Sequence, residues 1–279
     1  MTGPAADAAP APVAEPLSRA SSVRDRGEGV FDAEVSGTWT IGGRPNGGYL
    51  LAMLGRAGAA LVGSGHVVAA SAHYLRSPDP GPVEIGGEVL RRGRSLSQVR
   101  ARLSQGDRPA VEALLTVGLL DPSAAPRWDA GLPEAPQVPF EECVRVKPLA
   151  PDGTRVPVLD NVDLRLDPES SGLISGRPSG RGELRGWIEL LGEEEGFDPV
   201  ALLYAVDAFP PALFDTDAGA WISTVEMTAY IRAVPAPGRV RVLSRARLVD
   251  PQWVDQTCDV WDASGRFVAR AVQLAKVLG

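Results

Sequence analysis

The chain has 279 residues, of which 44% are hydrophobic and 23% are charged, and its formal net charge is −7. These values are ordinary for a globular protein that can bury a sizeable core. Lys147 and Lys276 are the only lysines, and the negative net charge leaves no diffuse basic surface, so nucleic acid is not an expected partner. The two cysteines, Cys143 and Cys258, fit neither a metal-site spacing nor a disulfide framework, which predicts two buried thiols in a cytoplasmic protein.

The first third of the chain contains a tail and one long apolar run. Residues 1–28 begin with an Ala- and Pro-rich stretch that lacks the basic and apolar regions of a secretory signal, so we expect a disordered tail. The apolar run at 48–63 is shorter than the ~20 residues that span a bilayer and contains Arg56, so no membrane partner is expected. It predicts a buried helix from about Gly47 to Leu61 with Asn46 as N-cap.

An internal repeat divides the rest of the chain into two similar halves. Residues 72–90 resemble residues 228–248, since each has an aromatic-aliphatic-Arg step, a Pro/Gly turn and then an alternating strand. Each copy leads to a further hairpin, with turn signals at 106–107 and 264–265. The two halves are therefore expected to fold on one plan.

A second apolar helix is predicted ahead of the second copy, with Asp198 as N-cap and the prolines at 210–211 at its end. Both predicted helices are apolar on nearly all sides, so each must be wrapped by a sheet rather than lie on a surface. This favours an α+β fold, a tandem or double hotdog in which antiparallel sheets each wrap a central helix. The predicted segments are a tail at 1–28, an N-terminal hotdog at 29–121, a linker at 122–155 and a C-terminal hotdog at 156–279.

Five stretches between residues 30 and 279 carry a resemblance to a known family: RPNGGYLLAMLGRA, HYLRSPDPGPVEIGGEVLRRGRSLSQVRARL, YAVDAFPPAL, WISTVEMTAYIRA and ARAVQLAKVL. They resemble the type II (TesB-like) acyl-CoA thioesterases. The resemblance implies a double-hotdog hydrolase of acyl-CoA thioesters that uses an Asp, a Thr and a Gln to handle the attacking water. Matched motif by motif, these fall on Asp207, Thr224 and Gln273. A thioester needs only a positioned water, so no metal or cofactor is expected.

Asp207 also stands out without the family, because its predicted helix face is shared with Val200, Leu203 and Tyr204. Burying an unpaired carboxylate costs several kcal/mol or raises its pKa, so the residue needs partners or a chemical role. The plainer interpretation is a helix-end Asp that reaches solvent through the Pro-Pro turn.

Gln273 is the one polar residue on its face of the last predicted strand, and the matching position in the first half is about Leu115. An amide can hold a water and bond a carboxylate at once, although a Gln satisfied by backbone at a sheet edge is commoner. Strict alternation turns Thr224 to the opposite side from the apolar residues of its strand, although a β-bulge or its place at the strand start could bring its hydroxyl inward. Strand threonines are usually only good β-formers.

Substrate contacts are predicted at two places. The start of the first helix, at Gly47 and Gly48, is expected to offer free N–H groups to the thioester oxygen. Arg94, in the LRRGRS stretch, is the candidate for coenzyme A phosphates, although a solvated hairpin turn is the plainer interpretation.

Two other functions stay open. One is a non-catalytic acyl-CoA-binding or scaffold protein with the same fold. The other is a hotdog hydratase or dehydratase, which needs a His paired with a carboxylate, and the sequence around His73 offers no such partner. His66 and His73 are the only histidines, and neither belongs to a triad or zinc motif. A tandem hotdog supplies its own dimer-like unit, and we expect it to pair further into a homo-oligomer.

Overall fold

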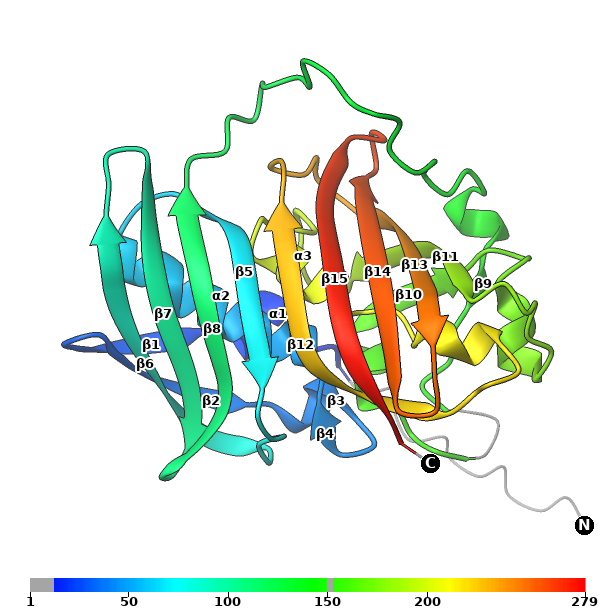
Figure 1. Cartoon of the computed structure of the whole chain (residues 1–279), viewed down its shortest axis with the longest axis horizontal. Helices are drawn as coiled ribbons and strands as arrows, with labels where there is room; N and C mark the ends of the chain where they lie inside the picture. Colours follow the sequence, from blue (N-terminus) through cyan, green and yellow to red (C-terminus); the bar gives the residue numbers. More distant parts are fainter. Residues whose placement is uncertain (1–12, 150–152, 279) are drawn as a thin grey trace, which may run out of the picture.

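The computed structural model describes residues 13–149 and 153–278. Within them, thirteen strands form one antiparallel sheet in the order β1-β2-β6-β7-β8-β5-β12-β15-β14-β13-β11-β10-β9. In Figure 1 this sheet faces the viewer, and helices α2 and α3 lie behind it. The α+β class predicted from the sequence is confirmed.

The helices are α1 (Leu17–Ala20), α2 (Gly47–Val62) and α3 (Ala201–Ala205). The strands of the large sheet are β1 (Val23–Gly27), β2 (Val30–Val35), β5 (His66–Tyr74), β6 (Gly81–Arg92), β7 (Leu96–Gln105), β8 (Arg108–Gly118), β9 (Val144–Arg145), β10 (Val162–Leu166), β11 (Glu183–Leu190), β12 (Trp221–Ile231), β13 (Val240–Val249), β14 (Trp253–Asp262) and β15 (Phe267–Leu278). A separate ribbon consists of β3 (Thr40–Ile41) and β4 (Arg44–Pro45).

The two halves of the chain join at β5 and β12, which pair from Glu226↔His73 to Tyr230↔Ala69. Outward from this pair the order is β8, β7, β6 on one side and β15, β14, β13 on the other. The mirrored order agrees with the repeat seen in the sequence. The strands of the two halves form one continuous sheet, because β5 and β12 satisfy each other's open edges.

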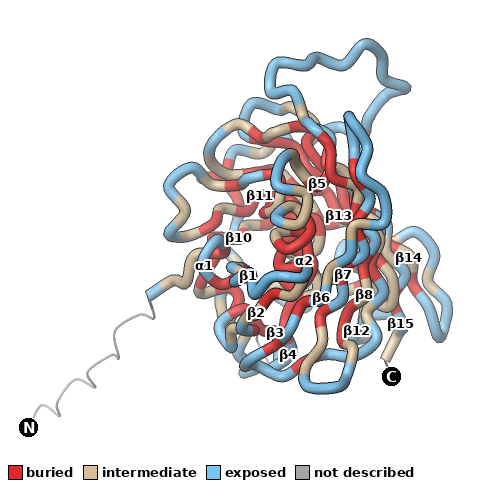
Figure 2. Tube along the Cα trace, turned by 90° about the vertical axis from the view of Figure 1, so that its left-hand side faces the viewer, coloured by how far each residue is buried: buried red, intermediate tan, exposed pale blue. Residues whose placement is uncertain are grey.

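Helix α2 is the buried centre of the N-terminal half. Asn46 caps it, as predicted, because its side-chain oxygen accepts the N–H of Tyr49 at 2.9 Å. The helix ends at Gly63, whose φ of 82° is the left-handed conformation that glycine adopts readily. Between Gly48 and Gly58 all residues except Arg56 are buried, and Figure 2 shows the helix buried along most of its length.

The second predicted helix is much shorter than expected. Asp198 accepts the N–H of Ala201, as its N-cap position predicts, but α3 has only five residues. Because Pro210 and Pro211 lack N–H groups and disfavour helical geometry in the residue before each, the chain leaves the helix early. Asp207 therefore lies in the turn after α3, where its N–H donates to the carbonyl of Tyr204 at 2.9 Å.

Two predicted segment boundaries are corrected. Residues 13–28, expected to be part of a disordered tail, form α1 and β1, while the rest of that tail lies outside the described residues. The predicted linker at 122–155 contributes β9, which pairs with β10 at the sheet edge. Within it, Phe140 and Cys143 are buried against Trp187, so part of the linker packs as a structural element.

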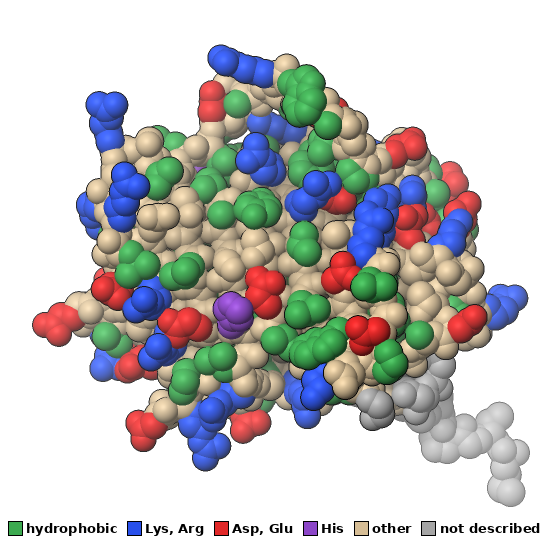
Figure 3. Space-filling view, viewed as in Figure 1, with side chains coloured by type: hydrophobic (Ala, Val, Ile, Leu, Met, Phe, Trp, Pro, Cys, Tyr) green, Lys and Arg blue, Asp and Glu red, His purple; other side chains and the backbone are tan. Residues whose placement is uncertain are grey.

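The outer face of the sheet carries a mixture of hydrophobic, charged and other polar side chains (Figure 3). The free thiols of Cys143 and Cys258 are both buried, as predicted. Among the described residues, no helix is long and apolar enough to cross a membrane.

Candidate active site

The start of α2 holds the carboxylate of Asp207. One carboxylate oxygen, Oδ2, accepts the backbone N–H of Gly48 at 2.8 Å and the side-chain amide of Asn46 at 3.3 Å. The same amide of Asn46 donates to the backbone carbonyl of Asp207 at 3.0 Å. Asn46 thus caps α2 with its oxygen and fixes Asp207 with its nitrogen, while Oδ1 of Asp207 makes no hydrogen bond with the described residues.

Burial disfavours the ionised form of the Asp207 carboxyl group. Burial raises its pKa from 3.8 to about 6, and the hydrogen bonds from Gly48 and Asn46 act in the opposite direction. At neutral pH the group is therefore mostly ionised but more basic than an ordinary Asp. A carboxylate with this pKa can accept a proton from a bound water near neutral pH.

Thr224 and Gln273 meet on the inner face of the sheet. A β-bulge between Thr224 and Glu226 shifts the register of β12 against β15, so Thr224 turns to the same face as Gln273. The hydroxyl of Thr224 donates to Oε1 of Gln273 at 2.9 Å. The bulge thus overturns the alternation argument against Thr224.

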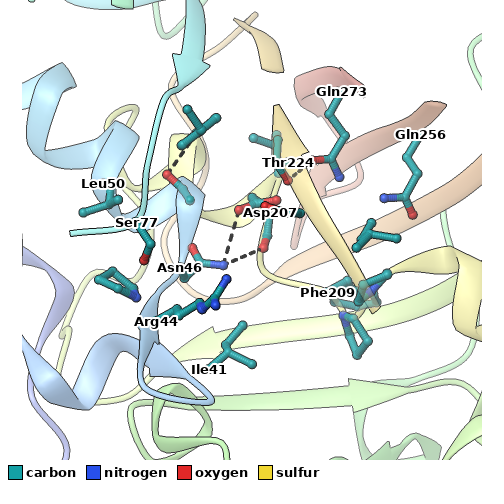
Figure 4. A pocket seen from close by; sticks show the side chains of 18 of the residues that line it. Ile41, Arg44, Asn46, Leu50, Ser77, Asp207, Phe209, Thr224, Gln256 and Gln273 are labelled. Carbon is teal, nitrogen blue, oxygen red and sulfur yellow. Dashed lines mark hydrogen bonds between the residues drawn. The ribbon is translucent and has the colours of Figure 1, made fainter. Parts of the chain in front are cut away.

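A single cavity of about 360 Å³ is lined by Asp207, Thr224 and Gln273 together with Asn46 and Gly47. Figure 4 shows the three predicted catalytic side chains on its wall, with Thr224 and Gln273 joined by their hydrogen bond. Five groups from α2, the turn after α3, β12 and β15 thus reach one space. The structure brings the predicted triad together even though its first and last members are 66 positions apart.

Glycine at positions 47 and 48 allows the two halves to approach closely here. A Cβ on Gly48 would lie 2.8 Å from the Cβ of Asp207 and 2.9 Å from the carbonyl of Leu203. A Cβ on Gly47 would lie 3.0 Å from Oδ2 of Asp207 and 3.2 Å from the ring of Tyr74. A side chain at position 48 would therefore force Asp207 or the backbone of Leu203 to move, and one at position 47 would crowd the carboxylate and Tyr74.

The two glycines differ in what their N–H groups do. Gly48 donates to Asp207, so the expectation that its N–H is free for a substrate oxygen is wrong. Gly47 lines the cavity, and within the described residues its N–H has no acceptor. The hydroxyl of Tyr74 donates to the carbonyl of Gly47 at 3.0 Å, and burial, followed by the charge of Asp207, raises the pKa of Tyr74 well above its ordinary value. Tyr74 is therefore a neutral hydrogen-bond donor that stabilises the start of α2.

Arg94 does not lie at this cavity. It is exposed in the turn between β6 and β7, two residues before Leu96. Leu96 pairs with Gly118, and Gly118 also pairs with His66 at the start of β5. Arg94 therefore lies near the start of β5. The cavity is lined at the other end of β5, by Tyr74. Eight residues of strand at ~3.3 Å each separate the two ends by ~26 Å. The prediction of Arg94 as a substrate contact finds no support in the fold.

Two other arginines stand at the cavity, and the sequence reasoning passed over both. Arg44 and Arg76 are exposed side chains on its lining, and in the described part of the chain neither forms an ion pair. Arg76 belongs to the aromatic-aliphatic-Arg step that repeats at Arg232. The repeat could have identified Arg76, because it places an arginine just beyond the end of β5.

Other cavity residues bear on which chemistry is feasible. Burial, followed by the charges of Asp259 and Asp207, raises the pKa of Cys258 well above its ordinary value, so its thiol stays neutral and is a poor nucleophile. His73 does face a carboxylate, since it pairs with Glu226 across the strands. That pair is absent from the cavity lining, so it does not offer the acid-base couple of a dehydratase there.

The family models match both halves of the chain. Residues 35–118 match the acyl-CoA thioesterase N-terminal domain and residues 135–277 match the acyl-CoA thioesterase C-terminal domain. The class defined by fold and family is thus that of thioester hydrolases. The chain belongs to the acyl-CoA thioesterase family, and its resemblance to the type II (TesB-like) members is confirmed.

The chain is also similar to individual proteins over most of its length. Uncharacterised proteins from Mycobacterium bovis and Mycobacterium tuberculosis are 33% identical over an alignment of 273 positions that covers 89% of this chain and 91% of theirs. A candidate thioesterase II from Thermobifida fusca YX has a TM-score of 0.85 and 36% identity, covering 96% of this chain and 99% of that one. A protein of unknown function from Alicyclobacillus acidocaldarius, described as having a hotdog fold, has a TM-score of 0.81 at 20% identity and covers 94% of this chain and 98% of that one. The fold is therefore a hotdog fold.

Proposed function

We propose that this protein hydrolyses acyl-CoA thioesters to a free acid and coenzyme A, using a water activated by Asp207, Thr224 and Gln273. We also propose that its two halves form a tandem, or double, hotdog that joins at β5 and β12. The observation that carries the functional proposal is the convergence of a carboxylate of raised pKa and a Thr-Gln pair on one cavity. Membership of the acyl-CoA thioesterase family supports the reaction type.

The hydrogen bonds of the three side chains support a role for each. Oδ2 of Asp207 is occupied by Gly48 and Asn46, so Oδ1 is left to accept a proton from the water. The proton of Thr224 is donated to Gln273, so toward the water Thr224 acts as an acceptor. The amide nitrogen of Gln273 then donates to the water oxygen, which leaves a lone pair for attack on the thioester carbon. General base catalysis of this kind contributes ~10²–10⁴ in rate.

The helix start stabilises the charge that develops on the carbonyl oxygen. In the proposed complex this oxygen accepts the N–H of Gly47, the donor on the cavity wall that has no acceptor among the described residues. One well-placed donor of this type is worth ~3–4 kcal/mol in the transition state. The coenzyme A phosphates lie outside, where Arg44 and Arg76 are exposed.

The two alternative functions make different use of the same fold. A scaffold that only binds acyl-CoA has no need for a buried carboxylate whose ionisation is disfavoured, and Asp207 is such a group. A hydratase or dehydratase needs a His beside its carboxylate at the cavity, and neither His66 nor His73 is among the lining residues.

A thiol-release assay over acyl-CoA esters of increasing chain length tests the proposal. We expect wild-type protein to release coenzyme A from at least one ester. A lack of release from every ester, combined with tight binding of one of them, would favour the scaffold function. Loss or gain of a double bond in an unsaturated acyl-CoA, without thiol release, would favour the hydratase.

A further inference from the structure

The inner wall of the cavity stays polar beyond the proposed catalytic residues. Gln273 of β15 pairs directly with Gln256 of β14, and on its other side it accepts the hydroxyl of Thr224 of β12. One step along the strands, Cys258 pairs with Ser244 of β13. Gln256, Ser244 and Cys258 all line the cavity, although only 2%, 7% and 6% of their surfaces are exposed.

The amide of Gln256 is held in one orientation. Its oxygen, Oε1, accepts the N–H of the fully buried Ala212 at 2.8 Å, and a backbone N–H can only donate. The amide nitrogen must therefore point the other way, and Figure 4 shows it turned toward the side where Asp207 and Thr224 lie. Among the described residues, neither this nitrogen nor the hydroxyl of Ser244 has a hydrogen-bond partner. Two polar side chains, each more than nine-tenths buried, thus line the cavity, and one of them has a fixed orientation.

An entirely apolar acyl chain is a poor occupant of this wall. It would displace water from Gln256 and Ser244 without replacing the lost hydrogen bonds, and an unsatisfied buried polar group is costly. In the proposed complex the coenzyme extends outward from the thioester, because its phosphates are expected at the exposed arginines at positions 44 and 76. The acyl group then extends from the thioester toward the buried residues of β14 and β13.

We propose that Gln256, assisted by Ser244, is a specificity-determining residue that selects acyl-CoA esters carrying a neutral oxygen, a hydroxyl or a keto group, close to the thioester. Gln256 stands one strand away from Gln273, at ~4.8 Å, which suits an oxygen on the third carbon of the acyl chain. The oxygen has to be neutral, because a carboxylate at this position would face the negative charge of Asp207. This inference rests on the proposed thioester hydrolysis and adds the class of acyl group.

The test compares two esters of equal size, 3-hydroxybutyryl-CoA and 3-methylbutyryl-CoA, in which a hydroxyl replaces a methyl group. Both esters carry the same coenzyme, so the contribution of coenzyme contacts cancels in the ratio of their kcat/KM values. We expect wild-type protein to favour the hydroxy ester at least ~10-fold, the value of one good hydrogen bond. We expect Gln256→Met to lower this ratio about tenfold and Ser244→Ala to lower it severalfold. Gln98→Met, on an exposed position of β7, is the matched control and leaves the ratio unchanged.

An equal or higher rate for the methyl ester with wild-type protein would overturn the inference, as would a ratio that neither Gln256→Met nor Ser244→Ala changes. Gln256→Met removes the acceptor of the Ala212 N–H, so its folding is checked by thermal unfolding. If it does not fold, Ser244→Ala decides, since that hydroxyl has no partner to lose among the described residues. If wild-type protein hydrolyses other acyl-CoA esters but neither of these two, the inference fails while the proposed function stands. If it hydrolyses no acyl-CoA ester at all, the proposed function fails, and calorimetric binding of the two esters measures the preference instead. Tighter binding of the hydroxy ester then supports the inference, while equal affinity or no binding contradicts it.

Discussion

Replacing Asp207 with asparagine is expected to stabilise the protein at neutral and alkaline pH. Burial raises the pKa of this carboxyl from 3.8 to about 6, so the folded state binds the proton more tightly than the unfolded state. Between pH ~4 and ~6 the folded state then holds more protons, and its stability falls as the pH rises through this window. At 1.36 kcal/mol for each pH unit, the loss above pH 6 reaches about 3 kcal/mol.

The asparagine variant escapes this loss because it has no charge. Its side-chain oxygen can still accept the N–H of Gly48 and the amide of Asn46, the two bonds that hold the wild-type carboxylate. We therefore expect Asp207→Asn to be more stable than wild type by up to about 3 kcal/mol at pH 8. The difference shrinks toward zero as the pH approaches 4.

Urea unfolding followed by tryptophan fluorescence, repeated from pH 4.5 to pH 8, measures this difference in the free energy of unfolding. Asp79→Asn is a suitable control, because that side chain is exposed and makes no hydrogen bond or ion pair with the described residues. The reasoning is refuted if Asp207→Asn is less stable than wild type at pH 8. It is also refuted if the difference between the two proteins does not change with pH.

Three further predictions concern the site and the assembly. Thr224→Val removes the hydroxyl that orients Gln273 and should lower kcat ~10-fold or more, while Thr224→Ser keeps most of the rate; equal rates for valine and serine in a thiol-release assay would exclude this role. Gly48→Ala places a Cβ 2.9 Å from the carbonyl of Leu203, so it should lower the free energy of unfolding in urea by ~1–3 kcal/mol and also lower the activity. Gly86→Ala, with open space around its Cβ, should lower neither the stability nor the activity. The chain should form a homodimer or larger oligomer, and a strict monomer by light scattering at micromolar concentration would refute that.

The sequence predicts best those elements that local patterns determine. The apolar run with Asn46 before it predicts α2 almost to the residue, since the cap and the helix are neighbours in the chain. The length of α3 could not be predicted in this way. The prolines at 210–211 show that the helix ends before them, but they do not show at which residue it ends. The pairing of β5 with β12 is a long-range contact, so no local pattern shows that the two halves share one sheet.

The candidate site shows the same division. Asp207 and Gln273 stand out in the sequence as single polar residues in apolar surroundings, and both line the cavity. The inward turn of Thr224 depends on a bulge against β15, which alternation alone cannot reveal. The prediction of Arg94 rests on its charge, yet the strand register places it near the start of β5, whereas the cavity lies near the end of β5. No pattern within a single strand marks Gln256, because its partner Gln273 lies on the neighbouring strand.

The central claim is that Asp207 is the general base of thioester hydrolysis, and the pH dependence of thiol release tests it most directly. With an acyl-CoA ester that wild-type protein hydrolyses, kcat/KM should be constant above pH ~7 and fall tenfold for each pH unit below the pKa of about 6. Asp207→Asn should lose ~10²–10⁴ of the rate and lack this acidic limb. If Asp207→Asn keeps most of the activity, or shows the same acidic limb as the wild-type protein, Asp207 is not the base and the account of this site is wrong.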